Sequence, residues 1–135
     1  MPLKLNLLVA EDDLNDQLMW DHLLVRPGWV FVHYVWSGVE VTDYLAGNGP
    51  FADRKKYPYP DILFLDVEMP RMNGLQVLDW IAANPAVVRP ATYICTGVGA
   101  SLLRKDIEKH PLAGFFEKPM TPAQVTKILE ERMNS

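Results

Sequence analysis

The sequence lacks several features that mark special classes of protein. Its single cysteine, Cys95, excludes an internal disulfide and lies in an apolar run, which fits a small buried side chain in a reducing compartment. No apolar segment approaches the roughly 20 residues that cross a bilayer, and residues 1–4 (MPLK) do not begin a signal peptide. We therefore expect a cytoplasmic protein without a membrane partner.

An excess of one charge is also missing. The net charge is −4, and the basic residues are scattered except for Arg54, Lys55 and Lys56. A nucleic-acid-binding domain usually presents a basic patch, so direct binding of nucleic acid is not expected. No internal repeat or linker is visible, and 135 residues of which 49% are hydrophobic suit a single domain over residues 1–135.

Short apolar runs alternate with amphipathic segments along the chain. Leu14, Leu18 and Met19 indicate one helix, and a second pattern at the helical period begins at Gly74. The last helix begins with Thr121 as N-cap and Gln124 completing a capping box. The repetition of strand and helix predicts an α/β fold, a doubly wound five-stranded parallel sheet with helices on both faces. The strand candidates are Leu5–Ala10, Val30–Val35, Ile62–Leu65, Thr92–Cys95 and Gly114–Phe116.

Two segments depart from this alternation. Gly47–Pro60 is rich in glycine, proline and charge, so we expect an extended surface loop, more readily a solvated connector than a partner-binding loop. Val98–Lys109 shows one weak amphipathic helix, and Gly97 and Gly99 loosen its start. This helix is expected to be the least rigid.

Polar residues follow four of the predicted strands at the point where each strand ends. In an open parallel sheet these carboxyl ends meet at one edge, where ligands bind. The residues are Glu11, Asp12 and Asp13 after the first strand, Asp66 after the third, Thr96 after the fourth and Lys118 after the fifth.

This set of residues predicts a metal-dependent phosphoryl site. Glu11, Asp12 and Asp66 would repel one another unless a cation neutralises them. All-oxygen ligation favours Mg²⁺, with the backbone carbonyl of Glu68 as a further ligand. The ammonium of Lys118 and the hydroxyl of Thr96 suit phosphoryl oxygens.

The ordered set resembles the receiver domain of response regulators in two-component signalling. The family's acidic pair falls on Glu11 and Asp12, and its phosphoacceptor on Asp66 within LDVEMPRMNG. Its hydroxyl falls on Thr96 and its lysine on Lys118, which precedes proline. The resemblance spans nearly the whole chain and implies the flavodoxin-like receiver fold.

The resemblance implies a function. A sensor histidine kinase or a histidine phosphotransfer protein would offer phosphohistidine, and the carboxylate of Asp66 would attack its phosphorus to form an acyl phosphate. Glu11 and Asp12 would hold Mg²⁺, while Lys118 and Thr96 would bind the phosphoryl oxygens. The protein would be a self-phosphorylating and self-dephosphorylating acceptor and not a turnover enzyme.

The family also implies a switch, in which Thr96 moves toward the phosphoryl group and the aromatic ring of Phe115 turns inward. Phe115 has no hydroxyl, so it cannot make the polar contact of the tyrosine common at this place. Output would pass to a downstream protein or a homodimer through the last strands and helices, and we expect no attached output domain. We expect Glu68 and Val98 to tune the phosphoryl lifetime, and the Lys118–Pro119 bond to be cis.

Other readings of these residues remain open. Asp66 alone could cap a turn, and Asp13 is more readily a helix N-cap than a metal ligand. A phosphatase that forms an aspartyl phosphate, with Glu68 as its acid, is one rival, although such enzymes place the nucleophile after the first strand. A flavin-binding module is disfavoured because Glu11, Asp12 and Asp13 would repel the flavin phosphate. A receiver-like module that binds a partner without phosphorylation is the last alternative.

Overall fold

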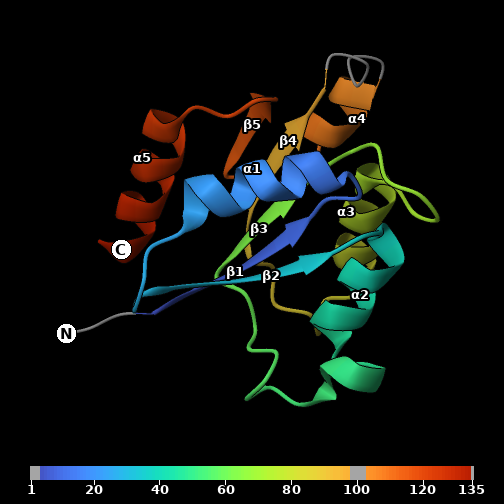
Figure 1. Ribbon diagram of the computed structural model, residues 1–135. Coiled ribbons are helices and arrows are strands. Elements are labelled where there is room, and N and C mark those ends of the chain that lie inside the picture. Colours follow the sequence, from blue (N-terminus) through green and yellow to red (C-terminus); the bar gives the residue numbers. More distant parts are fainter. Residues whose placement is uncertain (1–3, 98–102, 135) are drawn as a thin grey trace.

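The computed structural model describes residues 4–97 and 103–134 and shows one five-stranded parallel sheet with the strand order β2-β1-β3-β4-β5 (Figure 1). The predicted α/β fold is confirmed. The first three strands have the predicted bounds, whereas β4 is one residue longer at each end and β5 one residue longer at its carboxyl end. The strands are β1 (Leu5–Ala10), β2 (Val30–Val35), β3 (Ile62–Leu65), β4 (Ala91–Thr96) and β5 (Gly114–Glu117).

Helices cover both faces of the sheet. Helices α1 and α5 lie on one face, and α2, α3 and α4 lie on the other (Figure 1). Each face has its own core cluster, because successive strand side chains point to opposite sides. The helices are α1 (Leu14–Leu24), α2 (Gly38–Ala46), α3 (Gly74–Ala83), α4 (Arg104–Glu108) and α5 (Pro122–Met133), with a 3₁₀ helix η1 (Gly49–Ala52).

The centre of the sheet sets the position of the strand ends. All four residues of β3 are buried, as expected for a strand that is covered on both faces. Leu65 pairs with Ala10 of β1 and with Ile94 of β4. Asp66 directly follows β3 and Glu11 directly follows β1, so the two residues lie side by side at the carboxyl edge of the sheet.

Helix α1 exists as predicted, and Met19 packs against the core, but the prediction is wrong for the two leucines of the apolar pattern. The side chains of Leu14 and Leu18 are 61% and 63% exposed. The buried face instead carries Trp20, whose ring lies 4.7 Å from that of Phe64 between centroids. The helix turns its larger side chains toward the sheet, since these bury the most apolar area.

The segment 47–60 also differs from the expected extended surface loop. It contains η1 and packs aromatic side chains against the core, with the rings of Phe51 and Tyr57 5.0 and 6.0 Å from that of Tyr44 between centroids. The hydroxyl of Tyr44 donates to the carbonyl of Pro58 at 2.9 Å. The segment is therefore anchored to α2 along much of its length.

Local signals at helix ends were read correctly. Thr121 and Gln124 form the predicted capping box of α5, and the Asp13 side chain accepts from the backbone N–H of Asp16 at the start of α1. The Lys118–Pro119 bond is cis, as expected. Of the segment predicted as the weak helix, Val98–Leu102 lie outside the described residues and α4 accounts for most of the rest. None of the described helices is long and apolar enough to cross a membrane.

Candidate functional site

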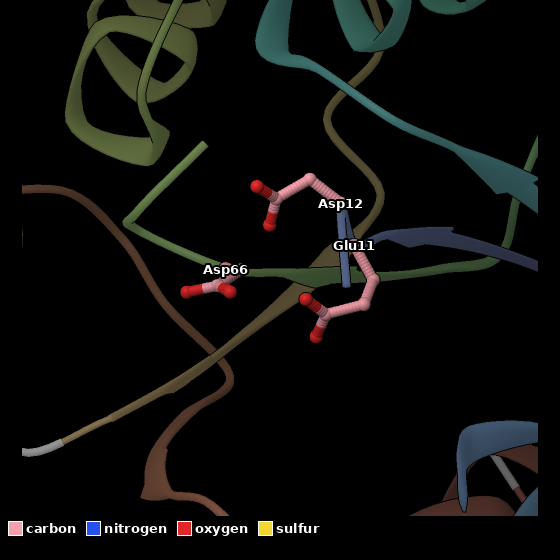
Figure 2. Close-up of side chains that lie close together, drawn as sticks. All are labelled: Glu11, Asp12 and Asp66. Atoms are coloured by element: carbon pink, nitrogen blue, oxygen red, sulfur yellow. The ribbon is translucent and has the colours of Figure 1, made fainter. Parts of the chain in front are cut away.

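Three carboxylates meet at the carboxyl edge of the sheet. Glu11 and Asp12 follow β1 and Asp66 follows β3, and one oxygen of each lies within 4.8 Å of the others (Figure 2). Glu11 and Asp66 are buried, whereas Asp12 is exposed. The structure therefore brings together the three predicted side-chain ligands, and this acidic group is able to bind a metal ion.

Asp66 is held by contacts to both of its oxygens. Oδ1 accepts from the backbone N–H of Glu68 at 3.1 Å, and Oδ2 accepts from Nζ of Lys118 at 2.7 Å. The backbone behind it is crowded, because a Cβ on Gly74 would lie only 2.7 Å from the carbonyl oxygen of Asp66. A glycine at the start of α3 thus allows the helix to approach the acid closely.

Lys118 lies at the centre of the negative charge. Its ammonium pairs with Asp66 at 2.7 Å, with Asp16 at 2.9 Å and with Glu11. Burial by itself would lower the pKa of Lys118, but hydrogen bonds to Asp66, Glu11 and Asp16 outweigh it and hold the pKa above its ordinary value. Lys118 is therefore a fixed cation in the site.

Asp16 is the site residue that sequence reasoning missed. It lies in the first turn of α1, three residues after the N-cap Asp13, so its side chain returns toward the strand ends. The spacing of an N-cap acid and a second acid three positions later was the available signal. Asp16 does not directly follow a strand, so the pattern of acids at strand ends does not include it.

The buried charge changes the protonation of Glu11. Burial, and to a smaller extent the negative charge of Asp66, raise the pKa of Glu11 to about 7 against the lowering effect of Lys118. Glu11 is thus poorly stabilised as an anion by the protein alone. A divalent cation beside it would favour the ionised form.

Thr96 stands at the end of β4 with an unsatisfied hydroxyl. The residue is 2% exposed, and within the described part of the chain its Oγ1 has no hydrogen-bond partner. Its backbone carbonyl accepts from the N–H of Lys118 at 2.8 Å, which ties β4 to the lysine. A buried hydroxyl without a partner costs free energy, so an acceptor that arrived nearby would be stabilised.

Phe115 on β5 contacts helix α4. Its ring is partly buried against the core on the α2–α4 face, and the guanidinium of Arg104 lies 4.2 Å from the ring centroid. Nε of Arg104 also pairs with Glu108 at 2.6 Å. The predicted switch residues Thr96 and Phe115 therefore occupy neighbouring strands.

The strand ends enclose an open pocket of about 380 Å³. Glu68 lines the pocket and is exposed. That its backbone carbonyl binds the metal ion stays a prediction. Val98, expected to tune the phosphoryl lifetime, lies outside the described residues. The lining residues are Glu11, Asp12, Asp13, Asp16, Asp66, Glu68, Gly97 and Lys118.

Comparison with known sequences identifies similar proteins. The model of the family "Response regulator receiver domain" matches residues 7–130. The chemotaxis protein CheY of Listeria monocytogenes is 26% identical over 129 residues, covering 94% of this chain and 97% of that protein. A protein-glutamate methylesterase/protein-glutamine glutaminase 2 of Chromobacterium violaceum is 39% identical over 66 residues, which cover 47% of this chain. The match spans only 18% of that relative's length.

Solved structures with the same fold include response regulators of light signalling. A response regulator in red light signalling of R. palustris, RPA3017, is 25% identical with a TM-score of 0.77, covering 94% of this chain and 90% of that one. The phosphorylated cyanobacterial phytochrome response regulator RcpA is 20% identical with a TM-score of 0.78, covering 95% and 90%. The Mn²⁺-bound form of response regulator Rcp1 is 18% identical with a TM-score of 0.73, covering 93% and 89%. The last two similarities establish the fold alone.

Proposed function

The chain belongs to the response regulator receiver family, the phosphoacceptors of two-component signalling, and from this premise we propose that Asp66 is the residue that accepts the phosphoryl group. One observation carries the assignment. Two further carboxylates and the ammonium of Lys118 converge on Asp66, whose own carboxylate lies in the lining of an open pocket. A nucleophile at this place can be reached from solvent and is surrounded by the charges that phosphoryl transfer requires.

The reaction follows from these positions. A carboxylate oxygen of Asp66 attacks the phosphorus of a phosphohistidine, the phosphorus–nitrogen bond breaks, and the imidazole leaves with the electron pair of that bond. Lys118 neutralises negative charge that develops on the phosphoryl oxygens. The Thr96 hydroxyl donates to one of these oxygens and so gains a hydrogen bond that it does not have to any residue of the ranges 4–97 and 103–134.

We assign Mg²⁺ as the cation of the site, with Glu11, Asp12 and Asp66 as carboxylate ligands and the backbone carbonyl of Glu68 as a fourth. The donor set fits a hard divalent ion, since all these ligands are oxygens. The raised pKa of Glu11 supports the assignment, because it marks negative charge that the protein alone leaves poorly neutralised. When bound, the ion neutralises charge on the transferred phosphoryl group. The response regulator Rcp1, which has the same fold, is known in a Mn²⁺-bound form, and this supports a divalent ion at the site.

The phosphodonor is a sensor histidine kinase or a histidine phosphotransfer protein, and we propose that it docks on α1. Leu14 and Leu18 lie one turn apart on this helix and are both more than half exposed. Asp13 and Asp16 at the start of the same helix line the pocket, so a partner docked on α1 would lie beside Asp66. Exposed leucines beside the point of transfer suit the apolar side of a partner helix.

The remaining parts of the proposal concern output. We propose a cytoplasmic protein whose residues 1–135 form one receiver domain, which phosphorylates and dephosphorylates itself and is not a turnover enzyme. Phosphorylation changes the surface of β4, β5, α4 and α5, which binds a downstream protein or a second copy of the chain. The Arg104–Phe115 contact supports this route, since it joins β5 to α4.

Incubation with Mg²⁺ and acetyl phosphate, followed by intact mass measurement, tests the assignment. The parent protein should gain the mass of one phosphoryl group, and Asp66→Asn should gain none. Asp13→Asn is the matched control, because it removes one charge from the same pocket and asparagine still caps the helix. Labelling of Asp66→Asn would refute the assignment. Continuous hydrolysis of p-nitrophenyl phosphate would favour the phosphatase alternative, and an unlabelled parent would favour binding without phosphorylation.

A further inference from the structure

Lys118 has as many carboxylate partners as its ammonium has hydrogens. An ammonium carries three N–H donors, and the carboxylates of Asp66, Asp16 and Glu11 surround it. The Lys118 side chain is only 15% exposed, which limits contact with water. A phosphoryl group on Asp66 that binds this ammonium must therefore compete with the carboxylates of Asp16 and Glu11.

Of the three acids, Asp16 can separate from Lys118 with the smallest loss of free energy. Glu11 and Asp66 are 1% and 7% exposed at their side chains and belong to the group that is close enough to hold a cation. Asp16 is 32% exposed and is not a member of that group. Water can solvate its carboxylate once the ammonium turns away, whereas a buried acid would lose its partner without replacement.

On the basis of the proposed function, we propose that Asp16 is a positioning residue that occupies the phosphoryl group's place on Lys118 in the unphosphorylated protein. Its carboxylate competes with the phosphoryl group for the ammonium and repels the incoming anion. Asp16 therefore opposes phosphorylation and favours return to the unphosphorylated state. It acts through Lys118 and does not touch the transferred group.

The two ligands of the site should respond to Asp16 in opposite directions. A phosphoryl group is an anion, so loss of the Asp16 charge removes both a competitor and a repulsion. A magnesium ion is a cation, so loss of the Asp16 charge removes part of the negative charge that attracts it. If Asp16 merely stabilised the fold, its replacement would weaken the binding of both ligands.

Calorimetric titration of Asp16→Asn with magnesium alone, and then with beryllofluoride at saturating magnesium, measures the two responses. Beryllofluoride serves as the phosphoryl mimic. We expect Asp16→Asn to bind it on the order of 3- to 30-fold more tightly than the parent, the range between an exposed ion pair and a charge-assisted hydrogen bond. Magnesium affinity should be lower, by at most about fivefold. Asp16→Ala should give the same pair of signs, and Asp16→Glu should restore the parent's values.

Asp13→Asn again supplies the control, since Asp13 lines the same pocket and shows no ion pair with Lys118. Equal effects of Asp13→Asn and Asp16→Asn on beryllofluoride would mean that charge alone is responsible and would overturn the proposal. Weaker binding of both ligands to Asp16→Asn would also overturn it. A parent protein that binds no beryllofluoride would instead refute the proposed function, so the two failures are distinguishable.

Discussion

The two halves of the strand-end site are built differently. In the half formed by β1 and β3, Asp66 has partners at both oxygens, and Gly74 allows α3 to pack directly against its backbone. In the half formed by β4 and β5, the Thr96 hydroxyl lacks a partner in the described structure, and the partly buried ring of Phe115 has the exposed Arg104 on its α4 side. In the first half, Asp66 is already held in position for a ligand. In the second half, the Thr96 hydroxyl can still form a hydrogen bond.

This difference indicates how a phosphoryl group on Asp66 could act at a distance. Asp66 in the β1–β3 half has little to gain by moving, because both of its carboxylate oxygens are already paired. The β4–β5 half gains a hydrogen bond if Thr96 reaches the phosphoryl group, and that gain can offset the loss of other contacts. The contacts at risk lie on α4, a helix of only five residues. We therefore expect phosphorylation to rearrange the β4–β5 half and not the β1–β3 half.

The largest expected effect comes from the unpaired hydroxyl. Thr96→Val should weaken beryllofluoride binding by about 10- to 150-fold, which corresponds to about 1.5–3 kcal/mol for a hydrogen bond to a charged group. The same change should leave the free energy of unfolding unchanged or slightly higher, because the hydroxyl has no partner among the described residues to lose. Urea unfolding without ligand and titration with ligand measure the two quantities.

Thr92→Val is the matched control on the same strand. Thr92 is also buried, but its hydroxyl donates to the carbonyl of Pro90 at 2.9 Å. Its loss should lower the free energy of unfolding by about 0.5–1.5 kcal/mol and leave ligand binding as it was. If Thr96→Val destabilised the ligand-free protein as much as Thr92→Val, the hydroxyl of Thr96 would have a partner and the contrast between the two halves would fail.

The next effect tests the close packing of the first half. Gly74→Ala places a methyl group 2.7 Å from the Asp66 carbonyl oxygen, so α3 or the acid must move. We expect a loss of about 1–3 kcal/mol in the free energy of unfolding, the usual range for overpacking, together with weaker magnesium binding. Urea unfolding and magnesium titration provide the measurements.

Gly97→Ala gives the corresponding test in the second half. A Cβ on Gly97 would meet no atom of the described residues within 4 Å, so this change should alter stability by less than about 0.5 kcal/mol. Similar losses for the two variants would show that the halves are equally crowded. A stable Gly74→Ala with normal magnesium binding would show that the approach of α3 does not position Asp66.

Much of the fold and the centre of the site could be predicted because strong local signals agreed with the global arrangement. The buried strands are continuous apolar runs that end at charged residues, and parallel pairing then brings Glu11, Asp66 and Lys118 to one edge. Capping residues marked the start of α5 in the same way. The closeness of Glu11, Asp12 and Asp66 follows from topology without knowledge of side-chain packing.

The missed features depend on tertiary choices that local patterns do not encode. Helix α1 carries two candidate apolar stripes, and only the fit of Trp20 against Phe64 decides that Leu14 and Leu18 face outward. The segment 47–60 has the composition of a loop, yet its aromatic residues find Tyr44 on α2. Asp16 contacts Lys118 across 102 positions of sequence, which no periodicity reveals.

The smallest expected effect concerns the outer contact of Phe115. Arg104→Ala removes a guanidinium that lies 4.2 Å from the ring centroid, a cation–π contact worth about 0.5–1 kcal/mol at an exposed place. If that contact holds Phe115 outward, its loss favours the inward position and should tighten beryllofluoride binding by about two- to fivefold. Lys105→Ala, which removes an exposed cation from the same helix, and Glu108→Gln, which removes only the ion pair of Arg104, should each leave the affinity unchanged. Tighter binding in all three variants would assign the effect to α4 as a whole and not to the ring contact, whereas weaker binding in Arg104→Ala would mean that Arg104 stabilises the phosphorylated arrangement of the β4–β5 half.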